Sequence, residues 1–67
     1  MNDESNIEEM ELTVHVLDET EKAYKIFDGD TEAWIPKSLI VLVSPTANVN
    51  VINIVIPEWL AEKKGLV

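Results

Sequence analysis

The stretch from Ser38 to Pro57 carries no Asp, Glu, Lys or Arg, in a chain of only 67 residues. It contains two runs of strand length, Leu39 to Val43 and Val49 to Ile56, separated by a turn-forming SPTAN segment. Because both faces of the second run are largely apolar, a small sheet cannot bury them all. We therefore expect cover from a C-terminal helix, or a homodimer formed through residues 39–56.

The chain has few means of stabilising a fold other than packing. It has no Cys and one His, so disulfides, thiolate metal sites and His clusters are excluded. The apolar stretch is interrupted by Pro45 and by Asn residues, which does not suit a membrane helix. The acidic N-terminus is unlike a secretory signal. We expect a single cytoplasmic domain without membrane contact, metal or cofactor.

Thirteen acidic and five basic side chains give a net charge of −8. Five of the acids lie within the first eleven residues, which leaves the remainder only mildly acidic. We predict a flexible acidic tail over residues 1–10 and a folded domain over 11–67. Because phosphate contacts dominate nucleic-acid affinity, this charge disfavours general DNA or RNA binding.

Periodicity indicates three more strands ahead of the uncharged stretch. Apolar residues alternate from Met10 to Leu17, as is typical of a half-buried strand, and residues 18–21 are expected to form a loop. Residues 22–27 and 31–35 flank Asp28-Gly29-Asp30, which predicts a hairpin. Five short strands with short connections favour a small antiparallel barrel.

The C-terminus predicts a short helix over residues 57–65. Pro57 suits its first position, and Gly65 is placed to adopt the left-handed conformation that ends it. Leu66 would then fold back onto the helix. Because a helix this short is not stable alone, we expect Trp59, Leu60 or both to dock on the barrel.

The aromatic side chains are the main candidates for a binding surface. No Ser, His and acid arrangement, calcium loop or glycine-rich phosphate loop is evident, so we do not expect an enzyme. The rings can all belong to the core. Alternatively, if Tyr24 and Ile26 face inward, then Phe27 and Lys25 face outward and can form an exposed platform with Trp34, with Lys22 nearby. The candidate binding residues are Tyr24, Lys25, Trp34, Lys37 and Trp59.

Two segments, ETEKAYKIFDGDTEAWIPKSLI (Glu19 to Ile40) and IPEWLAEKKGL (Ile56 to Leu66), resemble a group of short uncharacterised proteins of tailed bacteriophages and prophages. The likeness lies in the EKA strand, the WIPKS turn and the terminal helix. It implies an accessory role in phage DNA metabolism or in interference with a host system. Together with the exposed aromatic residues and the lack of a catalytic arrangement, this leads us to expect a non-enzymatic module that binds a host or phage protein. The alternatives are an accessory single-stranded nucleic-acid binder and an acidic nucleic-acid mimic that inhibits a host defence nuclease.

The WIPKS segment (residues 34–38) also resembles the strand, Pro and 3₁₀ turn that precede the last strand of Src-homology-three-like barrels. This second resemblance implies a strongly curved five-stranded antiparallel barrel. Here, however, two strands are expected after Pro36, where that family has one. The likeness therefore bears on the fold more than on the function.

Overall fold

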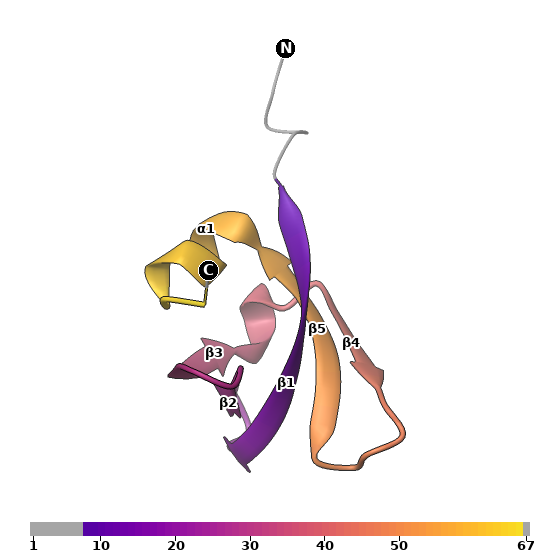
Figure 1. The fold of residues 1–67 in the computed structure, drawn as a ribbon. Helices are drawn as coiled ribbons and strands as arrows, with labels where there is room; N and C mark the ends of the chain where they lie inside the picture. The colour runs from indigo at the N-terminus through magenta and orange to yellow at the C-terminus, as the bar shows by residue number, and fades with distance from the viewer. Residues whose placement is uncertain (1–7, 67) are drawn as a thin grey trace.

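The computed structural model describes residues 8–66, which form one five-stranded antiparallel sheet and a short C-terminal helix (Figure 1). This confirms the mainly β fold expected from the sequence. The 3₁₀ turn expected after Pro36 is also present, between β3 and β4. The elements are β1 (Glu9–Glu19), β2 (Ala23–Phe27), β3 (Glu32–Pro36), the 3₁₀ turn (Lys37–Leu39), β4 (Leu42–Pro45), β5 (Val51–Pro57) and α1 (Glu58–Lys63).

The sheet is curved but does not close into a barrel. Its strand order is β3-β2-β1-β5-β4 (Figure 1). Strands that follow one another in the chain are neighbours in the sheet, with the exception of β3 and β4. These two strands lie at opposite ends of the sheet and share no ladder in the described chain. Both end strands terminate in a Pro, Pro36 in β3 and Pro45 in β4. Proline has no N–H to give to a further strand, which is consistent with an open sheet.

The central strand β1 is longer than predicted. It begins at Glu9 and continues through Asp18 and Glu19, which pair with β2, so the expected loop over 18–21 shortens to the turn around Thr20. The Thr20 hydroxyl accepts the backbone N–H of Lys22 (3.3 Å) and of Ala23 (3.1 Å), which closes this turn. Of the acidic tail expected over residues 1–10, the first seven lie outside the described residues.

The last two strands begin later than predicted. The expected ranges were 39–43 and 49–56, but Leu39 belongs to the 3₁₀ turn and the strands cover Leu42–Pro45 and Val51–Pro57. The Thr46 side chain accounts for the later start of β5, because its hydroxyl donates to the Val51 carbonyl oxygen (2.8 Å) and accepts the Asn48 N–H (3.1 Å). These bonds keep the turn closed as far as residue 50.

The core lies on the concave face of the sheet, beneath α1 (Figure 1). Alternate residues of the paired strands point to this face, which is why β1, β2, β3 and β5 each contribute fully buried aliphatic side chains. The helix adds Leu60 and Ala61, and Leu66 folds back into the same cluster, as expected. The strand residues of this core are Val14, Ile26, Ile35, Ile54 and Ile56.

Helix α1 ends in the left-handed glycine that its sequence predicts. Gly65 has φ +76°, its N–H donates to the Glu62 carbonyl (3.2 Å), and the Leu66 N–H donates to the Ala61 carbonyl (2.8 Å). This pair of bonds is a Schellman motif, which satisfies carbonyls at the helix end and turns Leu66 into the core. The helix begins one residue later than expected, at Glu58, because Pro57 remains in β5.

We expect Gly65→Ala to lower the free energy of unfolding by about 1–2 kcal/mol, the cost of a left-handed conformation for a residue with a Cβ. An added Cβ meets nothing closer than Thr31 Cγ2 at 3.9 Å, so the loss arises from backbone conformation and not from a clash. Urea unfolding followed by circular dichroism measures it. Gly65→Asn is the matched control and should lose less, because Asn tolerates this conformation. Equal stability of the Ala variant and the parent would contradict the assignment.

The hairpin between β2 and β3 is organised by the Asp28 carboxylate. Asp28 Oδ1 accepts the backbone N–H of Asp30 (2.8 Å) and of Thr31 (2.7 Å), and Gly29 takes φ +105°. The bonds from Thr31 and Asp30 favour the ionised carboxylate and lower the pKa of Asp28 below its ordinary value. The turn is therefore held most firmly when Asp28 is charged.

This hairpin predicts a pH-dependent contribution to stability. Because the folded-state pKa of Asp28 is lowered, its contribution is complete above the ordinary value of 3.8 and is lost as pH falls through the folded-state pKa. Asp28→Ala should therefore be less stable than the parent at pH 7, and the gap should narrow in acid. Urea unfolding across this pH range measures the gap. Asp28→Asn is the matched control, because it keeps an acceptor oxygen without a charge. A stability difference between Asp28→Ala and the parent that does not change with pH would refute the assignment.

Candidate functional site

The convex face of β2 and β3 presents a small apolar surface around Trp34. Lys25 and Trp34 are direct cross-strand partners, and Phe27 is the next residue of β2 on their face. The intervening residue Ile26, like Ile35 beside Trp34, is fully buried on the opposite face. The structure thus brings together Lys25, Phe27 and Trp34, with Trp34 exposed and the other two half-buried.

A bulge in β1 adds Leu17 to this surface. The register shifts between Val16, which pairs with Ile26, and Asp18, which pairs with Lys25, so Leu17 is the extra residue. Leu17 is 47% exposed and Trp34 41% exposed. We call Leu17, Lys25, Phe27 and Trp34 the outer platform. It combines exposed apolar area with one cation on a rigid sheet.

The charges of the outer platform are balanced by acids at its border. Lys25 Nζ lies 3.7 Å from Glu32 Oε1, and Asp18 is the cross-strand partner of Lys25. Glu32 in turn pairs across the strands with Phe27. The surface around the rings is therefore neutral to acidic, not basic.

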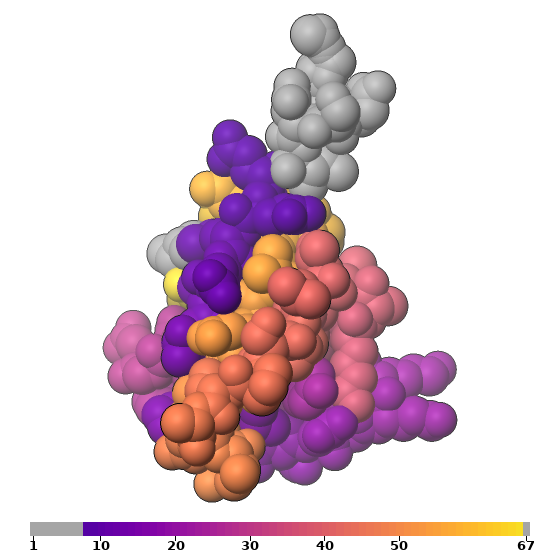
Figure 2. All heavy atoms as spheres, turned by 90° about the vertical axis from the view of Figure 1, so that its right-hand side faces the viewer, coloured from indigo at the N-terminus to yellow at the C-terminus, as the bar shows by residue number. Residues whose placement is uncertain are grey.

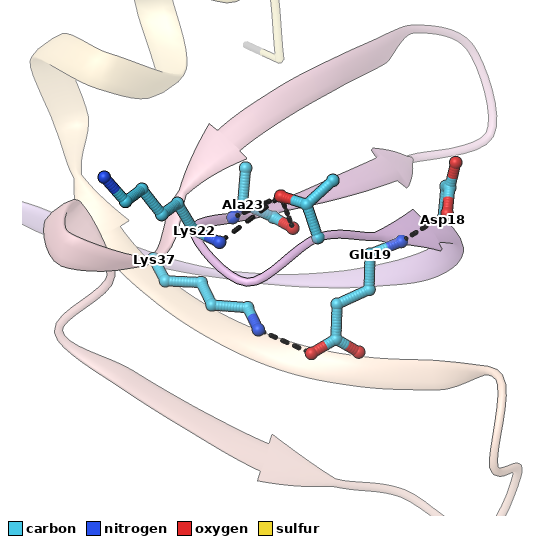
Figure 3. Close-up of polar contacts among 6 residues, drawn as sticks. Asp18, Glu19, Lys22, Ala23 and Lys37 are labelled. Atoms are coloured by element: carbon cyan, nitrogen blue, oxygen red, sulfur yellow. Dashed lines mark hydrogen bonds and ion pairs between the residues drawn. The ribbon is translucent and has the colours of Figure 1, made fainter.

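Tyr24 and Lys37 lie together on the other face of the sheet. Lys37 Nζ is 2.5 Å from Glu19 Oε2 (Figure 3). The same atom lies 4.8 Å from the centroid of the Tyr24 ring. Glu19 and Tyr24 are cross-strand partners, and Ile35 is the β3 partner of Tyr24. The three side chains form a polar cluster that joins the end of β1 to the 3₁₀ turn.

This ion pair with Glu19 balances the positive charge of Lys37. The hydrogen bond with Glu19 raises the pKa of Lys37 above its ordinary value. Beside it lies an open hollow of about 440 Å³ lined by Glu21, Lys22, Lys37 and Ser38. The Lys22 side chain points away from the Glu19–Lys37 pair (Figure 3). The four residues that line this hollow are charged or polar, whereas ordinary small-molecule sites are lined mainly by hydrophobic and aromatic side chains.

Trp59 lies apart from both groups, on α1. Its neighbours Leu60 and Ala61 face the core, while Trp59 is 50% exposed. Of the two residues expected to dock the helix, Leu60 therefore does so and Trp59 projects into solvent. The five candidate residues thus occupy three places: the outer platform (Lys25, Trp34), the polar cluster (Tyr24, Lys37) and the helix (Trp59).

The start of α1 brings acidic side chains together. The Glu58 N–H donates to the Glu8 carbonyl (2.8 Å), which attaches the chain ahead of β1 to the helix. A side-chain hydrogen bond with Glu8 raises the pKa of Glu58, and the charges of Glu8 and Glu62 act in the same direction. The neighbouring carboxylates therefore favour the protonated form of Glu58.

Within residues 8–66, no three His, Asp or Glu side chains are arranged to hold a metal ion. No helix in this part of the chain is long and apolar enough to cross a membrane.

Comparisons with known protein families, curated proteins and solved structures found no match to this chain. The protein is therefore classified by its own fold and by the outer platform. It is a small open antiparallel sheet that is capped by a helix on one face and carries exposed apolar side chains on the other.

Phe27 was expected on an exposed platform without being one of the five candidates, and two further residues of these surfaces were not expected from the sequence at all. Leu17 was detectable, because it is an apolar residue on the polar face of an alternating strand that also carries Glu11, Thr13 and His15. Glu19 was assigned to a loop, and the sequence carries no signal that its partner is Lys37, eighteen residues further along. That contact depends on the pairing of β1 with β2 and on the 3₁₀ turn.

The exposure of the two Trp side chains makes a direct prediction about stability. We expect Trp34→Phe and Trp59→Phe each to change the free energy of unfolding by less than about 0.5 kcal/mol, because surface substitutions have small effects. Ile35→Ala, at a fully buried neighbour of Trp34, should cost about 2–5 kcal/mol. Urea unfolding compares the three variants. A loss from either Phe variant as large as that from Ile35→Ala would place that indole in the core.

Proposed function

We propose that this protein is a non-enzymatic binding module that recognises another protein through the outer platform, as an accessory protein of a phage or prophage in the bacterial cytoplasm. The observation that carries the proposal is the exposure of two large apolar side chains, Trp34 on β3 and Leu17 on β1, with Lys25 of β2 between their strands. Trp is the residue most enriched among energetically dominant interface positions, and exposed apolar surface with a polar rim is typical of interfaces.

The charges around the outer platform specify the kind of partner. Glu32 and Asp18 border the rings, and the chain as a whole carries a net charge of −8. A partner segment with an apolar side chain seated against Trp34 and basic side chains toward these acids is complementary to this surface. A general steering effect of the acidic chain would speed its association with such a basic partner.

The same charges weigh against the nucleic-acid alternative. A single-strand binder needs aromatic side chains within a positively charged groove. Here Lys25 lies next to Glu32, and Lys37 is paired with Glu19 on the opposite face from Trp34. Neither cation is available to contact phosphates beside the outer platform without losing an acidic partner.

The test is affinity capture from a bacterial host lysate, with and without phage infection, followed by calorimetry on the recombinant partner. We expect Trp34→Ala to weaken binding by about thirtyfold or more, equivalent to about 2 kcal/mol at a dominant interface residue. Trp59→Ala is the matched control and should bind as the parent does. Leu17→Ser, at the other exposed apolar residue, should weaken binding in the same direction as Trp34→Ala.

Three outcomes would overturn the proposal. One is the absence of any specific partner at micromolar concentration, and a second is equal binding by the Trp34 and Trp59 variants. The third is Trp fluorescence quenching by single-stranded oligonucleotides that weakens as salt rises, which would assign the outer platform to nucleic acid. Deletion of residues 1–7 tests the acidic-mimic alternative separately, because it removes part of the acidic tail and leaves β1 intact from Glu9.

A further inference from the structure

The edge of the sheet at β4 carries a run of exposed apolar residues outside the outer platform. Val41, Leu42 and Val43 are consecutive and are 54%, 57% and 41% exposed. Figure 2 looks toward this side of the molecule, where β4 and the turn after it lie at the surface with no other element over them. The strip exposes both faces of the strand together with its edge.

The backbone of β4 has one free donor and acceptor couple at its centre. Pro45 is the partner of Ile52 but has no N–H. It therefore occupies a strand position whose backbone groups point away from β5. Backbone groups alternate in direction along a strand, so Val43, two residues earlier, also points its N–H and C=O outward. Val41 differs, because its N–H donates to the Val55 carbonyl (2.8 Å). The free edge is thus centred on Val43.

The electrostatics of this edge favour a second copy of the same chain as the occupant. No Asp, Glu, Lys or Arg occurs from Ser38 to Pro57, so two copies joined along β4 place no like charges in contact and desolvate none. The opposite edge of the sheet, β3, carries Glu32 and is followed by Lys37. In a chain of net charge −8, the β4 edge is therefore the sheet edge at which copies meet with least repulsion.

We propose that β4 pairs antiparallel with β4 of a second copy about a two-fold axis at Val43. The Val43 N–H of each copy donates to the Val43 carbonyl of the other, and Leu42 of one copy lies beside Ser44 of the other. Each Pro45 ends the shared ladder, since it has no N–H to contribute. The contact is self-complementary, as a two-fold interface requires, and joins two five-stranded sheets into one. It does not depend on the proposed function, because the outer platform lies on β1, β2 and β3.

The test is sedimentation equilibrium over a concentration series up to about 500 μM, which detects complexes with dissociation constants of micromolar strength. We expect the mass to approach twice 7.6 kDa. Val43→Lys should weaken the dimer at least about tenfold, because a charge on an edge strand opposes pairing. Val49→Lys is the matched control: it adds the same charge at a 90% exposed site outside β4 and should retain the dimer.

Salt provides a second readout. The two copies carry like net charge, so raising ionic strength from low to physiological, where the screening length falls to about 8–10 Å, should strengthen the dimer. Leu42→Lys serves in place of Val43→Lys should the latter unfold, as judged by circular dichroism. A monomer at the highest concentration, or lysine variants in β4 that dimerise as the parent does, would overturn the proposal. Dimer formation abolished by Val49→Lys and retained by Val43→Lys would also overturn it.

Discussion

The structure depends on the pairing of β1 with β5. This ladder runs from Glu9 and Pro57 to His15 and Val51, and it joins the first and last strands of the sheet in chain order. Because β1 also pairs with β2, it holds the charged β2–β3 hairpin and the uncharged β4–β5 hairpin in one sheet. The buried side chains Val14, Ile54 and Ile56 come from these two paired strands, so the core and α1, which follows β5 directly, are positioned by the same ladder.

This arrangement divides the surface into regions with different chemistry. The concave face is occupied by the core and α1, which leaves the convex face of β2 and β3 to expose Trp34 and Lys25. The open ends of the sheet differ as well, since β3 carries Glu32 while β4 has no charged residue. Our proposals follow this division: the face with balanced charges and the exposed Trp34 ring for a different protein, and the uncharged edge for another copy.

Local signals in the sequence predicted the elements better than their ends. The alternation from Met10, the Asp28-Gly29-Asp30 hairpin and the Gly65 stop all depend on neighbours in the chain, and each has the expected conformation. The predicted starts of β4 and β5 were too early. The 3₁₀ turn and the turn closed by the Thr46 hydroxyl include apolar residues, whose side chains suit a strand equally well. Closure of the sheet was also expected, and the Pro residues that end β3 and β4 oppose it.

The sequence by itself determined the strand and helix types, the absence of disulfides and the uncharged stretch, since these follow from side-chain periodicity, turn chemistry and composition. It also showed that Lys25, Phe27 and Trp34 can share a face, because alternation within a hairpin is local. Only the tertiary structure decided that Lys37 lies beside Tyr24, that Glu19 holds Lys37, and that β4 lies at an edge. Those relations depend on the register between strands distant in sequence and on the bulge at Leu17, where packing of the whole core outweighs local preference.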